Sequence, residues 1–287
     1  MNEVIEALAR DPLAGTTTLL MAAPGSGKTY SLHTWLKAGL RLCVLFTEPR
    51  GHESLIDACE RTGTPMDKLH WCYVAPAVPS WDSMIRSATL IGSMNYQGLA
   101  ELKTMQKEAY QQWIEMLRKM ANFKCERTGE VLGAVDSWGP DTCFAIDSLS
   151  GLNIMAMDLI AGAKPAKHQG EWGVAMDTEE RLIIKLCSAT KCFVVVTAHV
   201  EREGNELTGA SDIVASALGR KVGPKLPRWF SDTVFAYRVG RDFYWSTMTE
   251  NVVTKNRALP LADKLAPDFG QIVAAYKKRV EALNGKA

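Results

Sequence analysis

The sequence lacks the features that would mark a disulfide framework, a zinc site or a membrane span. Its seven cysteines form no Cys-x-x-Cys pair, and an odd number of cysteines cannot all be paired within one chain. No apolar run approaches the length needed to cross a bilayer, and residues 1–10 fit a polar–apolar helix without the apolar centre of a signal peptide. We therefore expect a reduced, cytoplasmic protein with no membrane partner.

An excess of charge of one sign is also missing. The net charge is +1, so the overall charge does not indicate a nucleic-acid partner, and any binding site for a polyanion must be local. The hydrophobic share of 47% and the charged share of 23% are those of an ordinary globular protein. Internal repeats, low-complexity tracts and linkers are absent as well, so we expect one domain over residues 1–287.

Short apolar runs that alternate with helical or polar segments predict an α/β fold with a parallel sheet. These runs cover residues 17–21, 42–46, 70–74, 143–146 and 193–197. From residue 232 the pattern changes to runs at 233–239 and 243–249 and a third near Asn251, spaced like antiparallel hairpin strands. We therefore predict a mainly parallel sheet flanked by helices, with an antiparallel edge.

A long helical block lies between Pro79 and Pro140. Its apolar residues recur every three or four positions, which predicts one amphipathic helix packed on the core, within a helical insertion at about residues 80–140. These residues are Leu99, Leu102, Met105, Ala109, Trp113, Met116, Leu117 and Met120. The turn-rich residues 125–140 then return the chain to the sheet.

The strongest motif is a phosphate-binding loop directly after the first apolar run. It fits the pattern G-x-x-x-x-G-K-[ST] at Gly27, Lys28 and Thr29, with Ala22 in place of the first glycine, and a helix-forming run follows at residues 30–40. Backbone N–H groups of such a loop and the start of the helix bind phosphate oxygens. Lys28 is expected to contact the β- and γ-phosphates of ATP, and Thr29 to bind Mg²⁺. The predicted nucleotide-binding residues are Ala23, Pro24, Gly25, Ser26, Gly27, Lys28, Thr29 and Tyr30.

Two carboxylates at the ends of apolar runs extend this site. Asp147 closes the run 143–146, the position of an aspartate that orients Mg²⁺ and its waters. Ser148 follows it, where many ATPases carry the glutamate that activates water, so Glu48, after the run 42–46, is our candidate base. The alternatives are that Glu48 is a solvated helix cap and that Asp147 is only a helix N-cap.

His199 follows the run 193–197 and is placed to sense the γ-phosphate; the alternative is a core or capping histidine. After it, residues 201–227 are long, Gly-rich and weakly periodic, as expected of a mobile loop. The local excess of basic residues in this segment predicts a binding site for a nucleic-acid backbone. The alternatives are a solvated charge cluster and a phosphate contact to a neighbouring subunit. The predicted DNA-binding residues are Arg220, Lys221, Lys225 and Arg228.

This order of motifs resembles the RecA-like ATPase core over roughly residues 15–260. More narrowly, five segments resemble phage-encoded AAA-type ATP-binding proteins, including relatives that act as minimal RecA-like annealing proteins. The segments are 169–173, 197–199, 219–221, 227–232 and 254–257. The resemblance implies nucleotide roles for Lys28, Thr29 and Asp147 and a γ-phosphate-sensing role for His199. It also implies that Lys255 and Arg257 reach across a subunit interface to the next nucleotide.

Together these features predict an oligomeric ATPase, a ring or filament, that uses ATP and Mg²⁺ to act on single-stranded DNA in phage recombination or replication. DNA-stimulated hydrolysis and a single-strand-binding protein partner belong to this expectation. One alternative is a small-molecule kinase of the nucleotide-kinase type, with residues 201–230 imitating its Arg-rich lid. Another is a nucleotide switch that recruits replication proteins with negligible turnover of its own.

Overall fold

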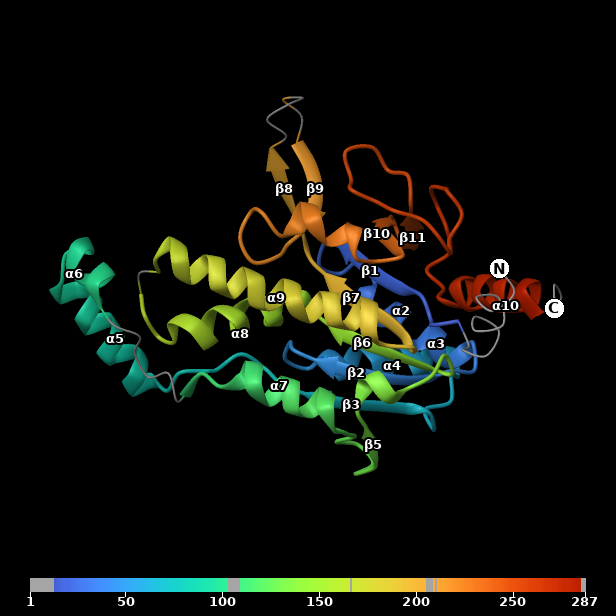
Figure 1. The fold of residues 1–287 in the computed structure, drawn as a ribbon, viewed down its shortest axis with the longest axis horizontal. Helices are drawn as coiled ribbons and strands as arrows, with labels where there is room; N and C mark the ends of the chain where they lie inside the picture. The colour runs from blue at the N-terminus through green and yellow to red at the C-terminus, as the bar shows by residue number, and fades with distance from the viewer. Residues whose placement is uncertain (1–12, 103–108, 166, 205–208, 210, 285–287) are drawn as a thin grey trace, which may run out of the picture.

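The computed structural model describes residues 13–102, 109–165, 167–204, 209 and 211–284, and a seven-stranded sheet lies at its centre (Figure 1). The strand order is β11-β10-β1-β7-β6-β2-β3, and every pair is parallel except β10 with β11. The predicted mainly parallel sheet with an antiparallel edge is thus confirmed. The strands are β1 (Thr17–Ala22), β2 (Arg41–Phe46), β3 (Leu69–Tyr73), β6 (Thr142–Asp147), β7 (Phe193–Ala198), β10 (Asp232–Val239) and β11 (Asp242–Ser246). The helix expected at residues 1–10 lies outside the described residues.

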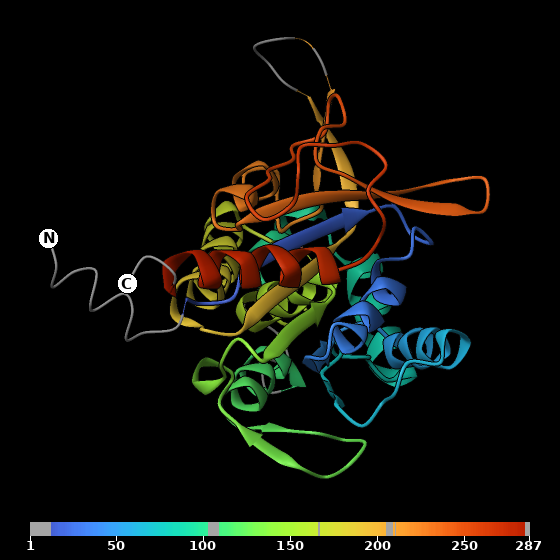
Figure 2. The same ribbon diagram turned by 90° about the vertical axis from the view of Figure 1, so that its right-hand side faces the viewer.

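Helices cover both faces of the sheet, and strand alternation divides the core between them. On β1, Leu19 and Met21 enter one apolar cluster while Leu20 and Ala22 enter the other, because successive side chains of a strand point to opposite faces. The first cluster takes side chains from α7 (Gln112–Ala121), α8 (Leu149–Ala161) and α9 (Gln169–Ala189). The second takes them from α3 (His33–Lys37), α4 (Gly51–Thr62) and α10 (Gly270–Asn284), the last of which crosses in front of the sheet in Figure 2.

The single amphipathic helix predicted across residues 99–120 is wrong. The chain instead forms α5 (Trp81–Ser93), α6 (Tyr96–Glu101) and α7, and Met105 lies outside the described residues. Leu102 has the extended ψ of 132°, which ends α6, and only α7 buries its apolar residues in the core. The regular spacing of apolar residues in the sequence therefore continues past Leu102, although the helix ends there. α5 and α6 project from the rest of the molecule in Figure 1.

The segment expected to be a loop at residues 201–227 is more regular than predicted. It contains the hairpin β8 (Val200–Gly204) and β9 (Ser211–Ala215), which projects at the top of Figure 1, and the 3-10 helix η3 (Gly223–Arg228). The third strand expected near Asn251 is wrong, since the segment makes only isolated bridges, Val252 with Ile213 and Lys255 with Thr233.

The turn-rich residues 125–140 hold a small ribbon and a short helix. These are β4 (Phe123–Lys124), β5 (Val131–Gly133) and the 3-10 helix η2 (Val135–Ser137). Within the described residues, no helix combines the length and the apolar content that a membrane span requires.

Candidate functional site

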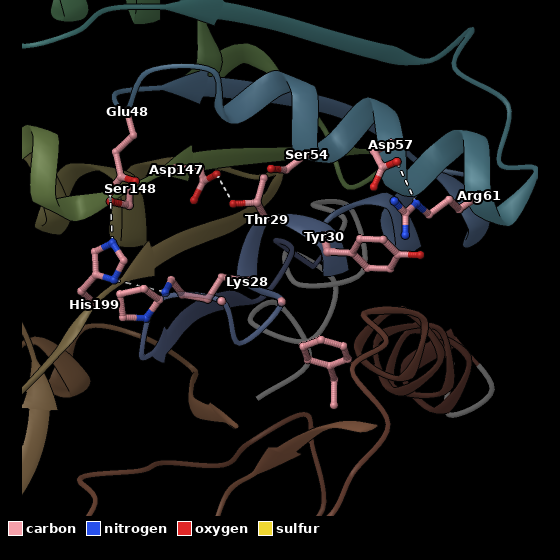
Figure 3. A pocket seen from close by; sticks show the side chains of 14 residues that line it. Lys28, Thr29, Tyr30, Glu48, Ser54, Asp57, Arg61, Asp147, Ser148 and His199 are labelled. Carbon is pink, nitrogen blue, oxygen red and sulfur yellow. Dashed lines mark hydrogen bonds and ion pairs between the residues drawn. The ribbon is translucent and has the colours of Figure 1, made fainter. Parts of the chain in front are cut away.

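The predicted phosphate-binding, metal-binding and catalytic residues meet at the carboxyl ends of four neighbouring parallel strands, β1, β7, β6 and β2. A pocket of ≈ 650 Å³ opens there. Figure 3 shows Glu48, Ser148 and His199 at one end of it, with Lys28 and Thr29 between them and the α4 side. Parallel strands bring their carboxyl ends to one edge, which is why residues far apart in sequence converge.

The loop between β1 and α2 (Lys28–Ser31) has the backbone of a phosphate cradle. Gly25 and Gly27 have φ of 72° and 82°, left-handed values that glycine adopts without strain, and Gly27 immediately precedes the helix. Nothing within 4 Å occupies the space where a Cβ of Gly25 would lie, so this backbone is open to a ligand. Successive N–H groups in such a turn form an anion-binding concavity, so the cradle fits the phosphates that the motif predicts.

Lys28 lies along this cradle. Its Nζ donates to the carbonyl oxygens of Ala22 and Ala23 at 3.0 and 3.2 Å and lies 3.4 Å from Nδ1 of His199. Burial lowers the pKa of the Lys28 ammonium, and the carboxylates of Asp147 and Glu48 act in the opposite direction. The ammonium is thus fixed beside the backbone amides on which phosphates would rest.

Thr29 and Asp147 supply hard oxygen ligands in contact with each other. Oγ1 of Thr29 donates to Oδ2 of Asp147 at 2.7 Å, and Oγ1 of Thr197, on the adjacent strand β7, donates to Oδ1. Burial raises the pKa of Asp147, while the two threonine hydrogen bonds oppose that shift. A hydroxyl and a carboxylate at the phosphate cradle are the donor set that Mg²⁺ prefers, so these residues fit the metal. The peptide between Asp147 and Ser148 is cis.

Glu48, Ser148 and His199 form a connected polar group beside Lys28. Oγ of Ser148 donates to Oε1 of Glu48, and Nε2 of His199 lies 3.4 Å from the same oxygen. The other ring nitrogen of His199 faces Lys28. One imidazole therefore connects Glu48 to Lys28.

The side chain of Thr47 links the residue before Glu48 to Ser148. Oγ1 of Thr47 donates to the carbonyl of Ser148 at 2.6 Å and accepts from the Ser148 N–H at 2.9 Å, tying β2 to the start of α8. Gly151 permits this approach, because a Cβ there would lie 2.8 Å from the carbonyl oxygen of Thr47 and closer still to its side chain. The Glu48 side chain is 41% exposed but accepts a hydrogen bond from Ser148, and the N-cap residue of α4 is Arg50 and not Glu48.

Sequence reasoning missed the far end of the pocket. Beyond Tyr30, which it included, the wall is made by Ser54, Asp57 and Arg61 of α4 and by Phe243 of β11. The three α4 residues lie at spacings of three and four, so they share one helix face, a signal that was present in the sequence. Phe243 follows Gly27 by more than two hundred positions, and no local pattern could have connected the two.

The four predicted DNA-binding residues divide between two places. Arg220 and Lys221 line a hollow of ≈ 910 Å³ with Trp172 and the hairpin β8–β9, whereas Lys225 and Arg228 are exposed on η3. Glu201 and Glu203 line the same hollow. The sequence between Asp212 and Asp232 contains no acidic residue, but the fold places Glu201 and Glu203 at the same hollow as Arg220 and Lys221.

Lys255 and Arg257 differ in how they are used. Nζ of Lys255 donates to the carbonyls of Pro227, Arg228 and Phe230 at 3.3, 3.3 and 2.6 Å, so in this structure it caps the end of η3. These internal bonds differ from the reach across a subunit interface that the resemblance implies for Lys255. The N–H of Arg257 donates to Asp232 at 2.8 Å, and its side chain is exposed.

Comparison with known families places the chain. A family model described as an AAA domain matches residues 14–258. The chain belongs to the AAA domain family. No curated protein sequence matches it.

Among solved structures, the chain is similar to the RadB recombinase, with 12% identity and a TM-score of 0.39 over 91% of this chain and 90% of that one. It is also similar to the flagellar accessory protein FlaH from Methanocaldococcus jannaschii, with 9% identity and a TM-score of 0.36 over 92% and 96%.

Proposed function

We propose that this protein is a RecA-like ATPase that hydrolyses ATP with Mg²⁺ and acts as a homo-oligomer on single-stranded DNA, in phage recombination or replication. The observation that carries the proposal is the convergence of Lys28, the Thr29–Asp147 pair and Glu48 on one pocket. Membership of the AAA domain family supports nucleotide hydrolysis in general. The DNA and phage parts rest on the resemblance of the motifs.

The chain's own groups divide the work of hydrolysis. Lys28 and the cradle amides bind the phosphates, and Thr29 and Asp147 would hold Mg²⁺, which neutralises phosphate charge when bound. Glu48 takes the proton of the attacking water, with the Ser148 hydroxyl orienting its carboxylate. His199, in contact with both Glu48 and Lys28, is placed to respond to the γ-phosphate.

DNA contact is assigned to the side of the molecule that carries the hairpin β8–β9 and η3. Arg220, Lys221, Lys225 and Arg228 are exposed there, and segment 216–218 connects them to His199 through the hydrogen bond from Ser216 N–H to the His199 carbonyl at 2.8 Å. Nucleotide at the pocket and DNA at this surface are thus joined by a short stretch of chain. Arg257 is the residue left to reach a neighbouring subunit.

Glu48→Gln tests the proposal most directly. The variant is expected to keep ATP binding and to lose hydrolysis by about 10²–10⁴-fold, because the amide keeps the shape but cannot accept the proton. Phosphate release is measured with and without single-stranded DNA, and ATP affinity by calorimetry. Lys28→Ala is expected to lose ATP binding itself.

Glu53→Gln is the matched control, since Glu53 is an exposed carboxylate in the first turn of α4. Its turnover should equal that of the wild type. Wild-type turnover in Glu48→Gln would instead remove Glu48 from the role of base. Transfer of the γ-phosphate to a nucleotide acceptor in place of its release would favour the kinase, and negligible turnover by the wild type under all conditions would favour the recruitment switch.

A further inference from the structure

α5 carries an apolar face that the described part of the chain leaves uncovered. The apolar residues recur at spacings of three and four, so they share one side of the helix. They are Trp81, Met84, Ile85, Ala88 and Ile91, and all are exposed, Trp81 by 79%. Ser83 is the one residue of α5 that is buried. Such a face, on a helix that projects from the molecule in Figure 1, is typical of a docking surface.

A small apolar hollow lies beside α8 and α9. Its volume is ≈ 260 Å³, and its apolar lining consists of Ile154, Met157, Trp172 and Leu218. Pockets that hold drug-sized ligands measure about 300–1,000 Å³, so this hollow is small for a free ligand. It suits one large apolar side chain, and tryptophan is a residue type that often fills such a place in protein interfaces.

One acid and one base accompany each of the two surfaces. Asp82 and Arg86 are exposed on α5, and Asp158 and Lys167 line the hollow. Within the part of the chain that the structure describes, none of the four forms an ion pair. Burial raises the pKa of Asp158 to about 6, and the charge of Lys167 acts in the opposite direction. A cation placed against this carboxylate would therefore favour its ionised form.

We propose that two copies of this chain exchange their α5 helices, so that Trp81 of each copy fills the hollow beside α8 and α9 of the other. Arg86 then faces Asp158 of the second copy, and Asp82 faces its Lys167. A second copy is the occupant that fits, because one chain carries both the apolar face and a hollow with matching charges. This inference rests on the homo-oligomer of the proposed function and adds to it the surfaces that join the copies.

The positions of the two surfaces allow the exchange to be mutual. Figure 1 shows α5 and the C-terminal end of α8 at the same end of the molecule. A copy that inserts its α5 into a neighbour therefore presents its own hollow to that neighbour. Two copies related by a two-fold axis can thus make the same contact twice.

Trp81→Ala tests the contact at its centre. The dissociation constant of the pair should rise by about 30-fold or more, the loss typical of truncating an interface tryptophan. Sedimentation velocity over a concentration series, with a non-hydrolysable ATP analogue present, measures this constant. Leu261→Ala is the matched control, because Leu261 is 65% exposed and does not line the hollow. It should leave the constant unchanged.

A mixture of two variants separates exchange from other modes of pairing. Ile154→Asp places a charge in the hollow at a position that is 50% exposed, and it should weaken association as well. Mixed with Trp81→Ala, it should regain part of the association, because the intact α5 of one variant meets the intact hollow of the other. Wild-type association of Ile154→Asp would mean that the α5 helices pack on each other, and it would overturn the exchange.

Hydrogen exchange of the unaltered chain gives a measurement that needs no variant. At high protein concentration, exchange should slow in α5 and in residues 153–158 together, relative to low concentration. Association without protection of both segments would overturn the proposal even if the variants failed to fold.

Two further results have separate meanings. If the wild type associates and Trp81→Ala associates equally well, the exchange is overturned while the homo-oligomer stands. If the wild type stays monomeric at every concentration, with and without the ATP analogue, the homo-oligomer of the proposed function fails together with the exchange. ATP hydrolysis is tested apart from both by Glu48→Gln.

Discussion

At the scale of single residues, the least expected feature is a buried carboxyl outside the nucleotide pocket. Glu179 of α9 is fully buried, and its Oε2 accepts from the Leu218 N–H at 3.2 Å. Its Oε1 has no partner among the described residues. Burial raises the pKa of Glu179 to about 8, so the side chain holds a proton at neutral pH. This neutral acid anchors the segment that leads to Arg220 and Lys221.

The raised pKa predicts how stability depends on pH. Because the folded protein binds this proton more tightly than the unfolded chain, the stabilising effect is complete below the ordinary glutamate pKa and is lost as pH rises toward about 8. The free energy of unfolding should fall over that window by on the order of 3–5 kcal/mol. Glu179→Gln should flatten this dependence, as denaturant titrations at several pH values would measure.

Glu60→Gln serves as the control, since Glu60 is exposed on α4. Its pH profile should match that of the wild type. An unchanged profile in Glu179→Gln would show that the Glu179 carboxyl is not the group that titrates.

At the scale of elements, the contact between β2 and α8 determines the geometry of the site. The N-terminal turn of α8 packs on the end of β2 through Gly151 and Thr47, and the same contact holds Ser148 beside Glu48. A helix glycine is usually a cost in stability, so its presence here reflects the space that Thr47 needs.

Gly151→Ala is therefore expected to destabilise the protein by about 1–3 kcal/mol, because an added methyl group would overlap Thr47 and force β2 and α8 apart. Thermal unfolding measures the loss. ATP turnover should fall with it, since the displacement moves Glu48.

Gly173→Ala provides the comparison, because Gly173 lies within α9 with nothing within 4 Å of its Cβ position. Here alanine should be neutral or add up to about 1 kcal/mol through helix propensity. Equal effects of the two substitutions would contradict the packing argument.

The elements also show how far sequence patterns reach. Lys28, Glu48, Asp147 and His199 could be placed because each follows an apolar run, and the carboxyl ends of parallel strands share an edge. The spacing of apolar residues could not predict that the helix ends at Leu102, because that spacing indicates which face of a helix is apolar and not where the backbone changes direction.

Other features depend on tertiary contacts that no local pattern encodes. Lys255 reads as a free cation in sequence, yet it bonds three carbonyls at the end of η3. Phe243 reads as an ordinary strand residue, yet it lies on the phosphate cradle. The acids Glu201 and Glu203 adjoin the basic segment only because β8 and β9 form a hairpin.

At the scale of the whole molecule, the proposed DNA-binding side and α10 are far apart, as Figure 1 shows for the hairpin β8–β9 and α10. Alanine at Arg220, Lys221, Lys225 and Arg228 should weaken binding to single-stranded DNA without weakening ATP binding. For every DNA phosphate that the variant no longer neutralises, the salt-dependence slope of binding should fall by about 0.7. Fluorescence anisotropy with a labelled oligonucleotide across a salt series measures both effects.

Alanine at Lys277 and Lys278, exposed on α10, is the control and should leave the slope unchanged. An equal fall in both variants would mean that charge acts at long range and not through direct binding of phosphates at this surface. If the wild type binds no DNA at low salt with nucleotide present, DNA is the wrong partner.

The strand order has a consequence for how the protein is made. β1, which leads into the phosphate cradle, lies between β7 and β10, so the ribosome has to add more than two hundred residues before both its neighbours exist. Pairings of such wide sequence separation form slowly, because loop closure comes before any gain from contact. The cradle is thus synthesised well before the strands that support it on both sides. Until β10 has been made, one edge of the buried strand β1 has no partner strand.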